Sequence, residues 1–250
     1  MILTIASREF KTLFLSPLAW TVLAILQCIL AYIFLTQLET FNIIQPKLAT
    51  VDNAPGLTDI VVTPLFGNAA IIFLLVTPLL TMRVICEERR NKTLSLLLSA
   101  PISNVDIIVG KYLGILGLLL LMSFLITLMP LSLLTGGVLD TGKLFANLLA
   151  LLLLVTAFVA TGLYMSCVAG HPTVAAIGTF GILLSLWILD WTAGIKDQRS
   201  ELFEYISILR HFQNLQSGLI SSVDVGYFLL FTGTFIVLSI RSLENGRLQK

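Results

Sequence analysis

The stretch EERRNKTLSLLLSAPIS, residues 87–103, separates two long apolar runs and holds the densest charge cluster of the sequence. On a helix, Leu94, Leu97 and Leu98 fall on one face, because residues three and four apart are neighbours on a helix surface. Pro101 ends such a helix, since it lacks an N–H group and clashes with the preceding turn. The pattern predicts a short amphipathic helix between two apolar segments.

A second helix is expected directly after this proline. Ser103 and Asp106 resemble a capping box, in which a serine caps the first turn and an acidic or amide side chain follows three residues later. The stretch therefore predicts an ordered connection, with one helix, a stop, a cap and the next helix.

The composition is that of a membrane protein. Hydrophobic residues make up 57% of the 250 and charged residues 12%, whereas soluble domains carry about 25% charged residues. Such a chain cannot cover a globule with polar surface, so we predict a polytopic membrane protein. The net charge of +1 gives no indication of nucleic-acid binding, and the three cysteines fit no zinc spacing or disulfide framework.

Six segments are apolar and long enough to cross a bilayer, which takes roughly 20 residues in helical form. The apolar run at 144–189 exceeds one crossing, and Gly170, His171 and Pro172 divide it. The first run is too long for the apolar part of a signal peptide, so we expect it to be retained. The prediction is an all-α fold in one domain, 1–250, with spans at about 18–38, 65–82, 107–134, 144–169, 173–189 and 225–240.

The charges flanking these spans predict the orientation. The N-terminal tail, the loop at 83–111, the turn at Gly170 and the C-terminal tail together hold ten basic and five acidic residues. The opposite flanks hold five basic and nine acidic residues. Because basic residues are enriched on the cytoplasmic side, we expect both termini and the loop at 83–106 to be cytoplasmic.

Two uses fit the short helix of that loop. It could anchor the loop in lipid headgroups, or it could be a coupling helix against which a cytoplasmic ATPase pushes. A lipid anchor needs only basic residues, whereas Glu87, Glu88, Arg89 and Arg90 carry both signs, which favours a specific protein contact. The residues assigned to coupling are Glu87, Glu88, Arg89, Arg90, Leu94, Leu97 and Leu98.

The N-terminus predicts an interfacial helix over residues 1–16. Apolar and polar residues separate onto two stripes, as in helices that lie in the plane of the membrane surface. The apolar stripe is Leu3, Ala6, Phe10, Leu13 and Phe14. The charged residues assigned to this helix are Arg8, Glu9 and Lys11.

Small residues in the third span predict close helix packing. Gly110, Gly114 and Gly117 have the spacing that lets two helices approach each other in a membrane. Contacts within one subunit and a seam between subunits both fit. In the outer segment at 192–224, apolar residues at helical spacing predict one or two short helices, and a surface loop is the alternative.

Catalytic and metal-binding patterns are missing from the sequence. No Asp, Glu, Lys or Arg lies at the centre of a predicted span, which disfavours an intramembrane enzyme and an ion-coupled carrier. His171 and His211 are expected on opposite sides of the membrane, so they predict neither a metal pair nor a catalytic dyad. We therefore expect a non-catalytic chain without a bound metal. Its apolar span residues suit an amphiphilic or lipid-like substrate, or the transmission of force to another protein.

Four stretches resemble ABC-2 type transporter permeases, of the gliding-motility-like branch. They are SREFKTLFLSPLAW at 7–20, EERRNKTLSLLLSAPISNVDIIVGKYLG at 87–114, GLYMSCVAGHPTVAAIGTFGILLSLWILD at 162–190 and HFQNLQSGLISSVDVGYFLLFTGTFIVLSIRSLE at 211–244. In that family the turn after the fourth span usually carries polar residues, whereas Ala169, Gly170, His171 and Pro172 stand here.

The resemblance implies a permease subunit in a bacterial inner membrane. Such permeases hold no ATP site or other cofactor, since ATP and Mg²⁺ bind in separate cytoplasmic ATPase subunits that dock on the coupling helices. Two copies of the permease, or the permease and a paralogue, form the pathway, and an auxiliary membrane-anchored protein can join them. A membrane scaffold or an intramembrane enzyme without an ATPase partner is the alternative. Substrate and direction of transport are not indicated.

Overall fold

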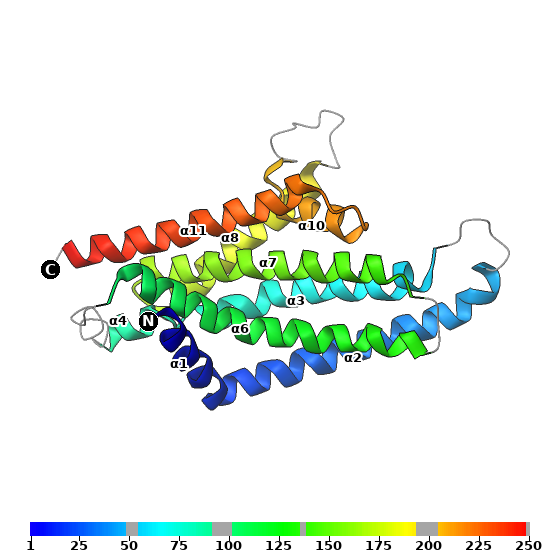
Figure 1. Cartoon of the computed structure of the whole chain (residues 1–250), viewed down its shortest axis with the longest axis horizontal. Helices are drawn as coiled ribbons and strands as arrows, with labels where there is room; N and C mark the ends of the chain where they lie inside the picture. The colour runs from blue at the N-terminus through cyan, green and yellow to red at the C-terminus, as the bar shows by residue number, and fades with distance from the viewer. Residues whose placement is uncertain (49–54, 92–101, 136–138, 194–204, 249–250) are drawn as a thin grey trace.

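The computed structural model describes residues 1–48, 55–91, 102–135, 139–193 and 205–248, and these are helical apart from short connections (Figure 1). The elements are α1 (Ile2–Leu15), α2 (Pro17–Leu48), η1 (Thr58–Val62, a π-helical turn), α3 (Thr63–Thr81), α4 (Cys86–Arg90), α6 (Asn104–Leu131), η2 (Ser132–Thr135, a 3₁₀ turn), α7 (Thr141–Val168), α8 (Pro172–Ala193), α10 (Ile208–Gln216) and α11 (Ser222–Leu248). The predicted coupling residues Leu94, Leu97 and Leu98 lie outside the described residues.

Six of these helices are long and apolar enough to cross a membrane, namely α2, α3, α6, α7, α8 and α11. The predicted fold class, an all-α polytopic membrane protein with six spans, is confirmed. The helices differ from the predicted spans mainly at their ends. α2 continues to Leu48 rather than ending near residue 38, because a helix that leaves the bilayer no longer needs apolar residues to remain helical.

Two helix ends that were predicted from local residues are found in the structure, one at the break before Pro172 and one at Ser103. α7 ends at Val168 and α8 begins at Pro172, because the first position of a helix tolerates a residue without an N–H group. The Ser103 side chain accepts a hydrogen bond from the Val105 N–H at 3.2 Å, which confirms Ser103 as the N-cap of α6.

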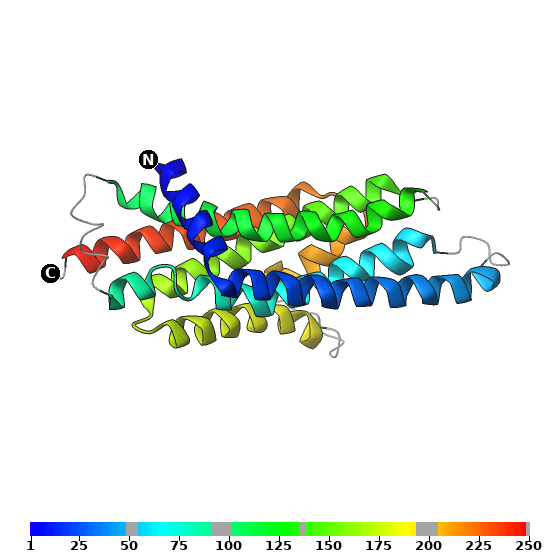
Figure 2. The same cartoon turned by 90° about the horizontal axis from the view of Figure 1, so that it is seen from below.

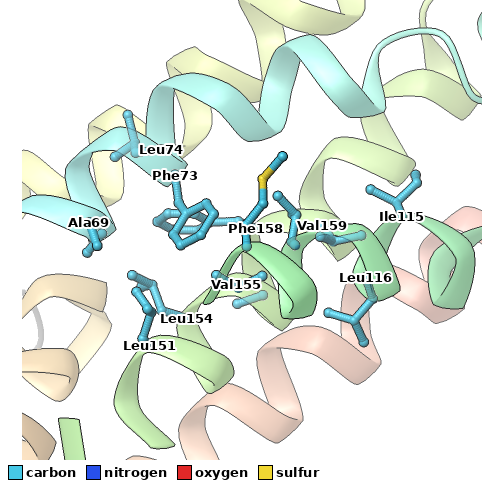
Figure 3. Close-up of a cluster of buried hydrophobic side chains, with 14 of the residues drawn as sticks. Ala69, Phe73, Leu74, Ile115, Leu116, Leu151, Leu154, Val155, Phe158 and Val159 are labelled. Atoms are coloured by element: carbon cyan, nitrogen blue, oxygen red, sulfur yellow. The ribbon is translucent and has the colours of Figure 1, made fainter. Parts of the chain in front are cut away.

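α7 forms the centre of the bundle. It contacts α3, α6, α8, α10 and α11, and its apolar side chains interlock with those of α3 and α6 (Figure 3). Phe73 and Phe158 are fully buried in this cluster. A side chain on Gly162 would collide with Thr81, so α3 and α7 pack with little space between their backbones.

The peripheral helices α2, α8 and α11 keep much of their apolar surface exposed in the single chain. Large side chains such as Tyr32, Ile177 and Leu230 project outward. In a bilayer such a surface faces lipid or another membrane protein, because lipid tails accept apolar side chains as readily as a protein core does.

The two ends of the bundle carry different elements. Both termini and α4 lie at one end, and α1 crosses that end obliquely to the long helices (Figures 1 and 2). α10 lies toward the other end, against α7 and α8. Ile208, Phe212 and Leu215 of α10 are buried, so the alternative of a surface loop is wrong for residues 208–216.

Candidate functional site

α1, α4 and α6 meet at the end of the bundle where the chain begins and ends. α1 packs along α6, and the predicted glycines are the reason that it can. A Cβ atom on Gly110 would lie 2.7 Å from the Cβ of Ile5, and one on Gly114 would lie 2.6 Å from the Cβ of Glu9. Real Cβ atoms do not approach so closely, so these glycines form a groove that holds α1 within the same chain.

One buried lysine connects the three helices. Lys111 of α6 is 2% exposed at its side chain. Its Nζ donates hydrogen bonds to Glu9 Oε1 of α1 at 2.5 Å and to Glu88 Oε1 of α4 at 2.7 Å. A third bond goes to the Val84 carbonyl oxygen at 3.1 Å. All three N–H groups of the ammonium are therefore used, as a buried cation requires.

This arrangement fixes the position of α4. α4 is joined to α6 by the Glu88–Lys111 pair, and α1 is joined to the same ammonium by Glu9. A displacement of either helix has to pull on Lys111. The three elements are therefore connected to one another at this end of the bundle.

A serine of α7 connects α4 to the centre of the bundle. The helical structure is interrupted between α3 and α4, which leaves backbone groups there without helical partners. The Ser166 hydroxyl accepts hydrogen bonds from the N–H groups of Ile85 at 3.1 Å and Cys86 at 3.2 Å, and donates to the Met82 carbonyl at 3.3 Å. α4 is thus held by both α6 and α7.

A cleft of about 340 Å³ opens between α1, the end of α3 and α4. Its lining includes Leu79 and Leu80 together with exposed charged residues of both signs, among them Arg8, Arg83 and Glu87. A surface that combines apolar side chains with charges of both signs suits contact with another protein.

The comparison with protein families agrees with this architecture. The family model described as ABC-2 family transporter protein matches residues 3–245 of the 250. The chain belongs to the ABC-2 transporter family. Together with its six apolar helices, this makes it a transmembrane permease. The comparison with curated proteins gives no match.

The match covers the ABC-2 family as a whole, so the gliding-motility-like branch stays a prediction.

The residues predicted for coupling in this permease divide between two environments. Glu87 and Arg90 are exposed on α4, whereas Glu88 turns inward to Lys111. On α1, Arg8 and Lys11 are exposed and Glu9 turns inward.

Sequence reasoning missed the central residue of this permease's cluster. In the sequence, Lys111 counts only among the basic residues of the loop at 83–111, which predict the orientation. The signal that could have found it is its position well inside an apolar helix, since a lysine there needs acidic partners. Two acidic residues, Glu9 and Glu88, lie on the same predicted side of the membrane.

Proposed function

We propose that this permease is the non-catalytic membrane subunit of an ATP-driven transporter in a bacterial inner membrane. A cytoplasmic ABC ATPase docks on the face formed by α1 and α4, and hydrolyses ATP with Mg²⁺ in its own subunits. The observation that carries the proposal is Lys111, which joins both surface helices to α6. A push on that face is therefore passed into the membrane-spanning helices.

The proposed orientation rests on charge. The exposed residues Arg8, Lys11, Arg83, Arg90 and Arg241 lie on elements at the end that carries both termini. Basic residues accumulate on the cytoplasmic side of membrane proteins, and ABC ATPases bind their nucleotide in the cytoplasm. The face proposed for docking is thus on the side where the energy source is.

The proposed transmission follows the two connections of α4. Movement of α4 acts on α6 through Glu88 and Lys111, and on α7 through Ser166. α1 adds a third route, since its Glu9 shares the same ammonium. The Glu88–Lys111 pair is well suited to transmit force, because an ion pair with little access to water is weakly screened.

The complete transporter contains two permeases, this chain with a second copy or with a paralogue. The exposed apolar surfaces of α2, α8 and α11 provide the area for that association. The membrane segments are apolar with few polar side chains, which suits an amphiphilic substrate or force transmission to an auxiliary membrane-anchored protein, as in the gliding-motility-like branch.

The test is co-purification of ABC ATPase subunits with the tagged permease from the cells in which it occurs. We expect the double variant Glu87→Lys and Arg90→Glu to lose the ATPase, because it reverses exposed charges on α4 without touching Lys111. Glu88 is left unchanged, since its reversal would place two cations together. The control is Glu39→Lys, which reverses an exposed acid of α2 beyond its predicted span.

The permease peak in size-exclusion chromatography should stay sharp in all variants. If the ATPase co-purifies unchanged with the Glu87→Lys, Arg90→Glu variant, α4 is not the docking element. If the Glu39→Lys variant loses the ATPase as well, the effect is not specific to this face.

A further inference from the structure

α10 and α11 are joined by a connection at 217–221, in which Gly218 adopts a φ of 93°. This turn brings His211 of α10 against Asp224 in the first turn of α11. Both residues are 4% exposed. His211 Nδ1 lies 2.5 Å from Asp224 Oδ1, and the Asn214 side-chain amide donates to the same oxygen at 3.4 Å.

The other ring nitrogen also faces an oxygen. His211 Nε2 lies 3.0 Å from the carbonyl oxygen of Tyr205. A carbonyl oxygen can only accept a hydrogen bond, so Nε2 carries a proton. A neutral imidazole has one N–H group, so its Nδ1 would then be an acceptor facing the Asp224 carboxylate, which is also an acceptor.

The two contacts therefore require one proton more than a neutral histidine and an ionised aspartate hold. That proton lies between Nδ1 and Oδ1, as an imidazolium facing a carboxylate or as a neutral imidazole facing a carboxylic acid. Without it, two acceptors would face each other, and their repulsion would weaken the contact between the two helices.

Few other charges face this pair among the described residues. The Tyr227 ring of α11 stacks on His211 with ring centroids 4.1 Å apart, and the Tyr205 ring meets it edge-on. Arg210 precedes His211 on α10 and lines the same pocket. α7 and η1 contribute Lys143 and Asp59, which pair with each other.

Protons can reach the pair from solvent. His211 and Asp224 form part of the wall of an open pocket of about 500 Å³. The pocket lies at the end of α11 that is remote from the C-terminus.

Two attachments of α10 to its neighbours are made by neutral amide groups. The Gln216 side chain donates to the Thr63 carbonyl of α3 at 3.3 Å, and the Asn147 side chain of α7 donates to the Gln216 carbonyl at 3.4 Å. Phe212 is buried against the bundle. A change of pH would act on the contact between α10 and α11 and leave α10 attached to α3 and α7.

We propose that His211 and Asp224 form a proton-dependent latch between α10 and α11. The contact as it stands needs the extra proton between Nδ1 and Oδ1. Its loss leaves two acceptors facing each other, so opening is favoured as pH rises. Histidine is the side chain whose ordinary titration lies between about pH 5 and 8. The latch controls the outer end of the last span, and it requires no ATPase.

The test measures the distance between spin labels on the two helices in the full-length permease in nanodiscs. Gln213 of α10 and Leu229 of α11 are exposed and are replaced by cysteine for labelling. The exposed native Cys28 is replaced by serine, while Cys86 and Cys167 are buried. We expect one narrow distance distribution at pH 5.5 and a second, longer component at pH 9 that disappears on reacidification.

The two histidines of the chain provide matched variants. His211→Gln should abolish the pH response, whereas His171→Gln, in the exposed turn before α8, should keep it. Asp224→Asn provides a second way to remove the response if His211→Gln does not fold. An unchanged distance between pH 5.5 and 9, a response that survives His211→Gln or Asp224→Asn, or a response lost in His171→Gln would each overturn the latch.

Discussion

Lys111 shows how a single residue can define a site in an otherwise apolar chain. Its ammonium is shared by carboxylates from two surface helices that lie 102 and 23 positions away in sequence. A lysine at this depth is costly unless it is paired. The two pairs therefore stabilise the fold only as long as α1 and α4 both stay in place.

Replacing this lysine should destabilise the permease. In Lys111→Met, the Glu9 and Glu88 carboxylates lose their cation. The cost should lie between the about 1 kcal/mol of an exposed pair and the about 3–5 kcal/mol lost when one partner of a buried pair is removed, because the two acids are 21% and 28% exposed. Thermal unfolding, followed by the size-exclusion peak that survives heating, measures this loss.

Lys143→Met is the matched control, since Lys143 pairs with Asp59 in a more exposed position. Adding Glu9→Gln and Glu88→Gln to Lys111→Met should recover part of the loss, because neutral amides do not need a cation. An equal loss of stability in Lys111→Met and Lys143→Met would contradict the central role of Lys111.

At the scale of elements, α1 is held by shape as well as charge. Gly110, Gly114 and Gly117 leave room for the helix to lie directly on the α6 backbone. The same contact brings Glu9 within reach of Lys111. Packing and ion pairing therefore support each other at this crossing.

Filling the groove should separate α1 from α6. Gly114→Ala introduces a Cβ atom 2.6 Å from the Cβ of Glu9, whereas Gly233→Ala in α11 meets nothing within 4 Å. Both changes raise helix propensity by up to about 1 kcal/mol, so only the first should lower thermal stability. Trypsin cleavage after Arg8 or Lys11 should also become faster in Gly114→Ala alone. Equal behaviour of the two variants would show that the groove does not hold α1.

The elements also show what could be predicted from the sequence. The six spans, the Ser103 cap and the break before Pro172 depend on apolar length and local backbone chemistry, and they were predicted. The glycine groove was predicted as close packing, but α1 was not identified as its occupant. The clusters around Lys111 and His211 were not predicted, because their acidic partners are brought to them by the folding of separate helices. The place of Lys111 inside an apolar helix indicates that it needs acidic partners but not which ones.

At the scale of the whole molecule, the two ends of the bundle differ in chemistry. One end holds α1 and α4 around a buried lysine, and the other holds α10 against α11 around a histidine and an aspartate. α7 extends between them and carries Ser166 near one end and Asn147 near the other. Under the two proposals above, the ends of the permease respond to different signals, contact with an ATPase at one and protons at the other.

The proposed orientation can be tested by labelling single cysteines in spheroplasts with a membrane-impermeant maleimide. With Cys28 replaced by serine, Gln213→Cys should react in intact spheroplasts, because α10 is proposed to face outward. Lys11→Cys on α1 should react only after permeabilisation. Labelling of Lys11→Cys in intact spheroplasts would place the α1–α4 face outside and contradict ATPase docking.

The length of α2 has a practical consequence. Its 32 residues extend for about 48 Å at 1.5 Å per residue, while the hydrocarbon core is roughly 30 Å thick. Even a tilt of about 40°, the upper end of the usual range, leaves the helix longer than the core. Its last turns, from Glu39 to Lys47, therefore extend beyond the hydrocarbon core, and an antibody epitope for imaging can be grafted at their end.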